Sequence, residues 1–169
     1  MKFYFDKSES IFFGIGSNLN DPKKQILKAI NYIKKEPSIE FVKSSKCYLS
    51  PPMGPQDQSH YFNLVIECKS KLNPLDLLNI VKSIESIMGR VENKRWHERI
   101  IDIDIIMYGQ LEFRSSILTI PHPLAFEREF VMKPLYDINK DIYMPGYGLV
   151  KELVKKCKYK VKKSVNLVE

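Results

Sequence analysis

The sequence is poor in cysteine and lacks a long apolar run, and both absences narrow the class of protein. Its three cysteines, at positions 47, 68 and 157, are odd in number and lack the spacing of a metal site, so we expect reduced thiols. No apolar stretch approaches the ~20 residues of a membrane-spanning helix, and residues 1–6 lack the apolar segment of a signal peptide. These features argue against a disulfide-rich secreted protein and against a membrane protein, and they predict a cytoplasmic one.

The common glycine-rich nucleotide-binding motifs are also missing. Gly14 and Gly16 end an apolar run, but Leu19 stands where the dinucleotide-binding fingerprint needs its third glycine, and the chain has no Walker P-loop. We therefore interpret the two glycines as positions where another segment approaches the backbone closely, or where a strand bulges.

The composition is that of an ordinary globular domain. A chain of 169 residues can bury a real core, and 44% of its residues are apolar and 28% charged. Internal repeats and low-complexity segments are absent from the sequence, so we expect a single domain over residues 1–169. The formal net charge of +7 suits anionic partners such as nucleotides, nucleic acids or a membrane surface. Much of the excess lies in a lysine-rich tail, which we interpret as a solvated face.

Apolar periodicity predicts two β-α-β units in succession, followed by additions at the C-terminus. The predicted strands cover residues 11–16 and 39–49 and the apolar stretches around residues 64–68, 101–107 and 118–120. The predicted helices begin at Pro22, at Pro74 and near residue 149. This order, βαββαβ, is typical of a ferredoxin-like α+β sandwich.

The second predicted helix combines an apolar face with two charged residues beside it. The apolar face is expected to consist of Leu75, Leu78, Val81, Ile84 and Met88. Lys82 and Glu85 lie off that face, where they reach either a ligand or water.

Two aspartates interrupt the run of isoleucines in the strand predicted over residues 101–107. Residues i and i+2 of a strand share a face, so Asp102 and Asp104 lie roughly 6.6 Å apart along one face, while the isoleucines face a core. Two carboxylates ~5 Å apart in a partly dry site repel each other by about 3 kcal/mol. A divalent cation relieves that repulsion, and oxygen ligands suit Mg²⁺. The alternative is a pair of solvated carboxylates on an open sheet face.

Arginines precede this strand, at Arg95 and Arg99. Guanidinium groups bind phosphates through two parallel hydrogen bonds. Carboxylates that can hold a metal, beside groups that bind phosphate, indicate phosphoryl chemistry.

A proline-rich loop over residues 50–58 leads directly into Tyr61 and Asn63. Three prolines and a glycine make a shaped loop with few free backbone donors. An aromatic ring and an amide held by such a loop suit a flat ligand ring with polar edges. The alternative is a purely structural turn.

Taken together, these motifs resemble the 6-hydroxymethyl-7,8-dihydropterin pyrophosphokinase family over about residues 11–150. The two most specific matches are Pro51-Pro52-Met53-Gly54-Pro55-Gln56-Asp57-Gln58 and Arg99-Ile100-Ile101-Asp102-Ile103-Asp104. Shorter matches are Gly16-Ser17-Asn18-Leu19, Tyr61-Phe62-Asn63, Ile84-Glu85, Gly89-Arg90, Arg95-Trp96, Pro121-His122 and Arg128-Glu129-Phe130.

The resemblance implies an ATP-dependent pyrophosphokinase of folate biosynthesis. Such an enzyme transfers pyrophosphate from ATP to the 6-hydroxymethyl group of 7,8-dihydropterin and releases AMP. The partners would be ATP and 6-hydroxymethyl-7,8-dihydropterin, with two Mg²⁺ ions bound with ATP, and we expect a monomer that binds neither nucleic acid nor membrane. The resemblance also implies the ferredoxin-like fold.

The resemblance assigns roles to individual positions of this chain. Asp102 and Asp104 would hold the metal and, with Arg90 and Arg99, would form the catalytic set; Asp102 is also a candidate acceptor of the substrate proton. The implied ATP-binding residues are Glu85, Arg90, Arg99, His122 and Arg128. The implied pterin-binding residues are Ser50, Pro52, Gly54, Tyr61, Asn63, Trp96 and Phe130, with Tyr61 and Phe130 on the two faces of the ring.

The sequence departs from the family pattern in the loop before the aspartates. His97 and Glu98 stand where Gly-Pro is common, and Glu92 stands where a basic residue is frequent. An alternative function is a non-catalytic nucleotide- or RNA-binding ferredoxin-like module. Nucleotide binding without catalysis would require that the altered loop has abolished turnover, and RNA binding is suggested by the basic charge of the chain. An RNA-binding module would carry an aromatic RNP1-like strand, which the sequence lacks. A two-metal nuclease would leave the proline-rich loop with Tyr61 and Asn63 unexplained.

Overall fold

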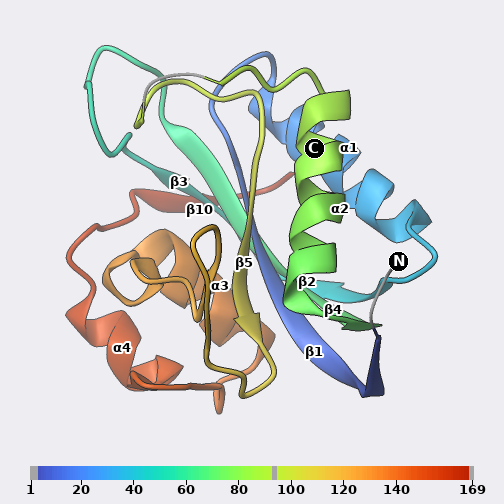
Figure 1. Ribbon diagram of the computed structural model, residues 1–169. Helices are drawn as coiled ribbons and strands as arrows, with labels where there is room; N and C mark the ends of the chain where they lie inside the picture. The colour runs from blue at the N-terminus through green and yellow to red at the C-terminus, as the bar shows by residue number, and fades with distance from the viewer. Residues whose placement is uncertain (1–3, 93–94, 168–169) are drawn as a thin grey trace.

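The computed structural model describes residues 4–92 and 95–167. Its centre is a six-stranded antiparallel sheet in the order β10-β3-β4-β1-β5, with β2 paired to the same edge of β4 as β3 (Figure 1). The strands are β1 (Tyr4–Ser17), β2 (Glu40–Ser44), β3 (Cys47–Ser50), β4 (Tyr61–Leu72), β5 (Asp102–Tyr108) and β10 (Lys163–Val165). Strands β1 and β4 lie in the middle and pair along most of their length.

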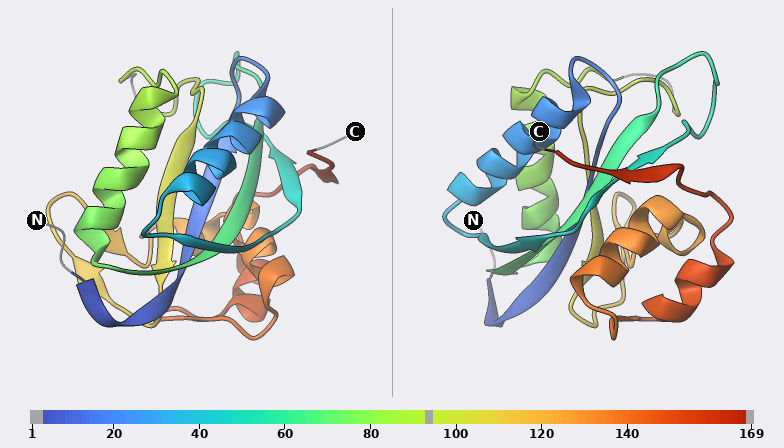
Figure 2. Two further views of the ribbon diagram at one scale, coloured as in Figure 1. Left: turned by 90° about the vertical axis from the view of Figure 1, so that its right-hand side faces the viewer. Right: turned by 180° about the vertical axis from the view of Figure 1, so that it is seen from behind.

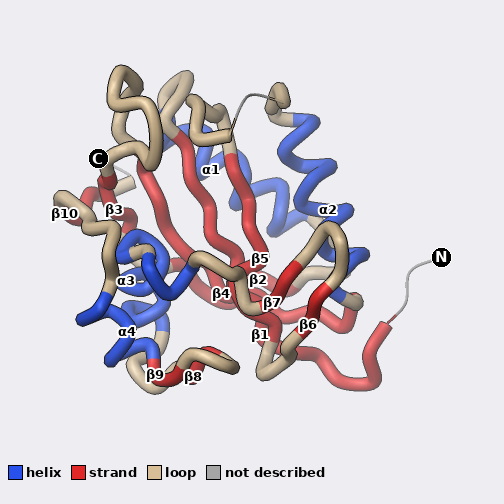
Figure 3. The backbone as a smooth tube through the Cα atoms, turned by 60° about the vertical axis from the view of Figure 1, so that its left-hand side comes forward, coloured by secondary structure: helices blue, strands red, loops and turns tan. Residues whose placement is uncertain are grey.

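Helices cover both faces of this sheet (Figure 2). The two helices on one face are α1 (Pro22–Lys35) and α2 (Pro74–Ile87), and those on the other are α3 (Glu129–Ile138) and α4 (Val150–Lys156). The short elements are β6 (Phe113–Arg114), β7 (Thr119–Ile120), the 3-10 helix η1 (Ala125–Glu127), β8 (Tyr143–Met144) and β9 (Gly148–Leu149). The β8–β9 hairpin lies beside α4, whereas β6 and β7 lie beyond β5, away from α3 and α4 (Figure 3).

The connection of β1 through α1 to β2 and β3, and of β4 through α2 to β5, gives the ferredoxin-like arrangement. Its two inner strands, β4 and β1, are flanked by the strands that follow α1 and α2. The fold expected from the sequence is therefore confirmed, and η1, α3, α4, the small hairpins and β10 are the C-terminal additions.

Alternating side chains divide the core into two clusters, one on each face of the sheet. Phe13, Ile15 and Ile103 are buried in the cluster that α1 and α2 cover. Phe12 and Ile106 point the other way and belong to the cluster beneath α3 and α4. The isoleucines of β5 therefore anchor that strand, as the alternation in the sequence predicts.

Three details differ from the prediction. The strand expected over residues 39–49 is interrupted at Ser45, whose backbone N–H donates to Val65 O (2.9 Å) and whose Oγ accepts from Val65 N (3.0 Å). On α2, Leu77 is fully buried whereas Leu75 is 37% exposed, because the face that meets the sheet is rotated from the one expected. Strand β10 was not expected, since a lysine-rich tail carries no apolar alternation. Within the described ranges, no helix combines the length and apolarity needed to cross a bilayer.

Replacing Ile103 by alanine should lower the free energy of unfolding by about 2–5 kcal/mol, because the side chain is fully buried and its loss leaves a cavity. The matched control is Ile117→Ala, at a side chain that is 68% exposed, which should change stability by less than about 0.5 kcal/mol. Urea denaturation of the two variants measures both values. Equal effects at the two positions would contradict the placement of β5 in the core.

Candidate active site

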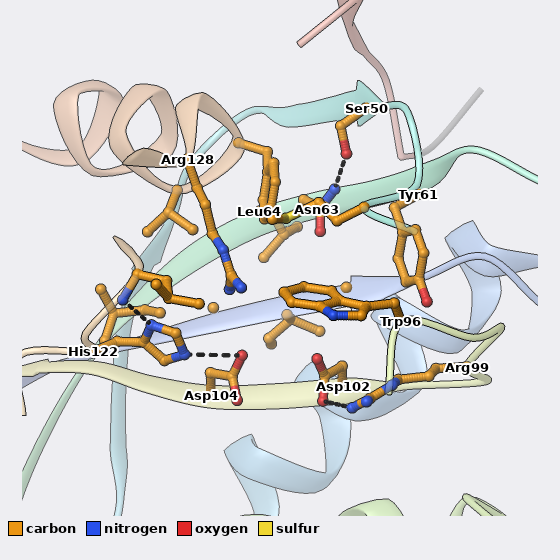
Figure 4. Close-up of a pocket in the computed structure, with 18 of the residues that line it drawn as sticks. Ser50, Tyr61, Asn63, Leu64, Trp96, Arg99, Asp102, Asp104, His122 and Arg128 are labelled. Carbon is orange, nitrogen blue, oxygen red and sulfur yellow. Dashed lines mark hydrogen bonds and ion pairs between the residues drawn. The ribbon is translucent and has the colours of Figure 1, made fainter. Parts of the chain in front are cut away.

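A pocket of about 410 Å³ opens on the α3 side of the sheet, where β1, β4 and β5 meet the start of α3 (Figure 4). Most of the polar residues singled out in the sequence line it. They are Ser50, Tyr61, Asn63, Arg90, Arg95, Trp96, Arg99, Asp102, Asp104, His122 and Arg128, together with the aromatic Phe130. Side chains from positions 50 to 130 of the chain are thus brought together in one site.

The floor of the pocket is built on the two glycines of β1. Gly16 pairs with Asn63 of β4 on one side and with Asp102 of β5 on the other. A Cβ atom at Gly16 would lie 2.7 Å from Asn63 Oδ1, so only glycine leaves room for that amide. Gly14 pairs with Asp104 in the same way, and a Cβ there would press on Ile106 at 3.1 Å. The interpretation of both glycines as positions of close approach is confirmed.

Two arginines bind the first of the two aspartates. Arg90 Nη1 lies 2.8 Å and Arg99 Nη1 3.1 Å from Asp102 Oδ1. Arg90 and Arg99 also line the pocket. Each guanidinium is therefore held by Asp102 while part of its surface faces the pocket. Guanidinium groups held in this way can donate further hydrogen bonds to an anion.

Asp104 lies in a different environment from Asp102. The described residues offer it no lysine or arginine within ion-pair distance, and His122 Nε2 lies 4.0 Å from its Oδ2. Burial and the neighbouring charge of Asp102 raise the pKa of Asp104 above its ordinary value. About a third of its side chain is nevertheless open to the pocket. A cation bound there would stabilise the ionised form.

His122 is held in a defined tautomer. The backbone N–H of Leu124 donates to its Nδ1 (3.2 Å), which leaves the ring proton on Nε2, directed at Asp104 (Figure 4). Burial, and secondly the charge of Arg128, lower the pKa of His122 to about 4. The imidazole is therefore neutral at physiological pH and is a hydrogen-bond donor toward the pocket.

Arg128 is a partly buried cation with one hydrogen-bond donor that the described part of the chain leaves unpaired. Its Nε is buried and has no hydrogen-bond partner among the described residues. Its guanidinium instead lies over the rings of Trp96 (5.6 Å) and Phe130 (5.7 Å), and burial lowers its pKa. A partly desolvated guanidinium with an unpaired donor is suited to an anionic ligand, because a buried donor without a partner is costly.

The structure does not bring Glu85 to the wall of the pocket, although the resemblance implies that it binds ATP. Glu85 is 2% exposed and accepts a hydrogen bond from the backbone N–H of Ile103 (2.6 Å). It also pairs with Arg90 and with Lys82 (3.0 Å), and these two partners line the pocket in its place. The expectation that Glu85 lies off the buried face is wrong, because the rotated face of α2 places it against β5.

Two residues of the proline-rich loop are also outside the lining. The carbonyl groups of Pro52 and Gly54 accept hydrogen bonds from Gln56 Nε2 (3.0 and 2.8 Å), and Met53 lines the pocket between them. Ser50 lies at the pocket itself, where its Oγ accepts from Asn63 Nδ2 (2.8 Å). This bond fixes the amide of Asn63, with its Oδ1 left as an acceptor.

The loop that carries Trp96 is tied to the proline-rich loop. Gln58 Nε2 donates to Trp96 O (2.6 Å), and the Tyr61 hydroxyl donates to His97 O (2.8 Å). Asn18 joins both loops, since its Nδ2 donates to Gln58 Oε1 (3.0 Å) and its Oδ1 accepts from Arg99 N (2.9 Å). The indole of Trp96 consequently extends across the pocket (Figure 4).

Several residues of the site have no role that the sequence motifs predict. Asn18 and Gln58 belong to matched motifs, but their hydrogen bonds connect segments up to 81 residues apart, and no local pattern reveals such a connection. Met53 and Leu124 are apolar lining residues, and their residue type does not distinguish them from core.

Of the departures from the family pattern, Glu92 is exposed and lies outside the lining, whereas His97 contributes a backbone carbonyl to the contact with Tyr61.

The pocket thus combines paired carboxylates, arginines held beside them and the guanidinium of Arg128 on a ferredoxin-like sheet. This combination defines an enzyme of the class that acts on phosphate-bearing substrates. Comparison with known proteins narrows the class. The chain belongs to the 7,8-dihydro-6-hydroxymethylpterin-pyrophosphokinase family (HPPK), whose model matches residues 12–140. The family indicated by the sequence motifs is thereby confirmed.

Curated relatives match over most of the chain. The 2-amino-4-hydroxy-6-hydroxymethyldihydropteridine pyrophosphokinase of Haemophilus influenzae is 41% identical over 144 residues, covering 85% of this chain and 90% of the relative. The protein of the same name from Aquifex aeolicus is 37% identical over 138 residues, covering 82% and 85%. Among solved structures, a Plasmodium falciparum HPPK-DHPS has a TM-score of 0.68 at 15% identity, covering 89% of this chain and 45% of that one. At that identity the likeness supports the fold alone.

Replacing Asp104 by asparagine should remove a pH-dependent loss of stability in the metal-free protein. Because the pKa of Asp104 is raised, the folded protein keeps a proton that the unfolded chain releases, so stability falls as pH rises through the raised pKa. We expect wild type to lose stability relative to Asp104→Asn between about pH 4 and pH 7, measured by thermal unfolding with a chelator. Asp141→Asn, at an exposed carboxyl outside the pocket, is the matched control. Parallel curves for wild type and Asp104→Asn would contradict the placement of Asp104.

Proposed function

We propose that this protein transfers the pyrophosphoryl group of ATP to the 6-hydroxymethyl group of 7,8-dihydropterin and releases AMP, as a step of folate biosynthesis. The observation that carries the proposal is that one pocket contains both the paired carboxylates of Asp102 and Asp104 and the side chains of Tyr61, Asn63 and Phe130. One part of the pocket suits a metal-bound polyphosphate, and the other suits a flat ring with polar edges.

The carboxylate pair fits Mg²⁺. The described residues contain no group of three or more side chains that could enclose a metal ion. Mg²⁺ is commonly held by one or two carboxylates and completes its coordination with water and substrate phosphates, so two aspartates are sufficient. Asp102 and Asp104 would hold two ions together with ATP, and the ions would neutralise charge on the phosphates.

The cationic side chains of the pocket would bind the triphosphate. Arg90 and Arg99 are already oriented by Asp102, and the Nε of Arg128 is a buried donor without a partner among the described residues. The neutral His122 offers an N–H donor near Asp104. Fixed donors of this kind stabilise charge without reorganising during the reaction, which is the main source of catalysis in phosphoryl transfer.

The pterin would lie in the other part of the pocket, between Phe130 and the wall that contains Ser50, Tyr61 and Asn63. Tyr61 and Phe130 would contact the two faces of the ring, and the fixed amide of Asn63 would meet its polar edge. Trp96 would cover the substrate from the loop side, and Ser50 orients Asn63. Pro52 and Gly54 would act through the shape of the loop, because neither lines the pocket.

The reaction is a displacement at the β-phosphorus of ATP. The hydroxymethyl oxygen forms a bond to the β-phosphorus, and the bond from that phosphorus to the oxygen bridging to the α-phosphorus breaks. That oxygen leaves with AMP, and the hydroxyl proton passes to a base, for which Asp102 is the candidate. The protein contributes chiefly by placing the two substrates in line. We also propose that the protein acts as a monomer in the cytoplasm and that it binds neither nucleic acid nor membrane.

The proposal predicts that the purified protein forms AMP from ATP and Mg²⁺ only when 6-hydroxymethyl-7,8-dihydropterin is present, in step with the pterin diphosphate. Chromatography of the nucleotides distinguishes the outcomes. Release of ADP would indicate transfer of a single phosphoryl group and would overturn the proposed reaction. Asp102→Ala, which should bind pterin without turnover, is the negative control.

Replacing Phe130 by alanine should raise the KM for the dihydropterin by about tenfold and leave the KM for ATP within about twofold, because an aromatic contact to the ring is lost. Steady-state kinetics with each substrate varied in turn measures the two constants. Phe126→Ala is the matched control, since Phe126 is on the same segment but stacks on Tyr147 (4.8 Å) outside the pocket. Equal increases in both constants for Phe130→Ala would count against stacking.

A further inference from the structure

The C-terminal residues 157–165, which we name the strap, connect two walls of the pocket. The strap begins at the end of α4, crosses the start of α3 and ends as β10 at the edge of the sheet (Figures 1 and 3). The residues that match the family model end at position 140, so the strap lies outside them.

The first half of the strap is hydrogen-bonded to the segment that carries Arg128 and Phe130. The backbone N–H groups of Lys158 and Tyr159 both donate to Glu127 O (2.9 and 3.0 Å), and Glu129 N donates back to Tyr159 O (2.9 Å). Helix α3 has no side-chain cap at its N-terminus, so the carbonyl of the strap satisfies one of its free N–H groups.

Glu129 makes the most specific of these contacts. Its side chain is buried, although it lies between two residues whose side chains face the pocket. Its Oε2 accepts a hydrogen bond from the backbone N–H of Val161 (2.7 Å), and Oε1 lies 3.2 Å from Lys133 Nζ and 3.9 Å from Lys160 Nζ. A buried carboxylate needs such partners, so the start of α3 is held to the strap at this point.

The second half of the strap is joined to the opposite wall. Lys162 N donates to Leu49 O (2.8 Å), and β10 then pairs with β3, with Ser164 opposite Tyr48. Strand β3 ends at Ser50, whose hydroxyl orients the amide of Asn63. The strap therefore spans from the residues beside Phe130 to the residues beside Asn63.

We propose that the strap is a positioning element for the pterin, and that the hydrogen bond from Val161 N to Glu129 sets the distance between Phe130 and the wall formed by Ser50 and Asn63. The inference rests on the proposed function, because it assumes that the pterin lies between these walls. Glu129 touches no substrate and acts through Phe130 and Arg128. A one-ångström change in such a gap weakens a stacked ring without removing any contacting group.

The test is the kinetic behaviour of Glu129→Ala and Glu129→Gln. Alanine removes the acceptor of the Val161 N–H and should raise the KM for the dihydropterin by about tenfold, with kcat within about twofold of wild type. Glutamine keeps an oxygen acceptor and should stay within about twofold of wild type in both constants. Glu152→Ala, at an exposed carboxylate of α4 that pairs with Lys155 (3.1 Å), is the matched control.

Val161→Pro tests the same bond from the other side, because proline has no N–H to donate, and Val161→Ala is its control. The double variant Glu129→Ala/Val161→Pro should have a KM for the dihydropterin no higher than that of the more affected single variant, because the two changes remove the same hydrogen bond. If Glu129→Ala does not fold, the Val161 pair decides the question.

Titration of each variant with 6-hydroxymethylpterin, followed by fluorescence, separates this inference from the proposed function. A wild type that binds the pterin but forms no AMP would contradict the proposed function. The role of the strap would then be decided by the pterin affinity of the variants relative to wild type. Variants that lose thermal stability while the pterin affinity and KM remain at the wild-type values would overturn the inference, because the strap would then only stabilise the fold.

Discussion

The repulsion between the carboxylates of Asp102 and Asp104 is the constraint on which the rest of the site depends. A strand places them on one face, and Ile103 between them is buried on the other, so neither aspartate can turn away. The protein offsets half of this charge with two arginines at Asp102 and leaves Asp104 without a comparable partner among the described residues. The imbalance makes the site receptive to a cation that arrives with its substrate.

The other charged residues in and beneath the pocket also affect the balance of charge at the two aspartates. Glu85 is buried beneath the sheet and holds Arg90 and Lys82, so an acidic residue that contacts no pocket space still determines where two cations lie. Arg128 is desolvated by aromatic rings instead of being neutralised by a carboxylate. Arg128 therefore carries positive charge on the wall opposite the aspartates. A metal-bound polyphosphate would complement both, with its metal at the aspartates and its phosphates at Arg128.

Much of the fold and part of the site could be predicted from the sequence. The alternation in β5, the helix start at Pro22 and the order of elements are local signals, and they identified the ferredoxin-like sheet and the shared face of the two aspartates. Glu85 could not be placed, because its burial depends on how α2 is rotated against the sheet. The contacts of Asn18 and Gln58 were equally inaccessible, since they join loops that only the folded sheet brings together. Strand β10 carries polar residues and pairs because β3 presents a free edge.

The pairing of Asn63, Gly16 and Asp102 across three neighbouring strands has a consequence for how the protein can fail. All three positions share one face because β1 pairs with both neighbouring strands in a continuous register over residues 13–16. A slip of one residue in β1 would bring Ile15 or Ser17, each with a Cβ atom, to the place that only glycine can fill, and it would expose the buried isoleucines. A misregistered sheet would therefore lose its core and its ligand site together. Any molecule that is well folded also has the floor of the pocket assembled.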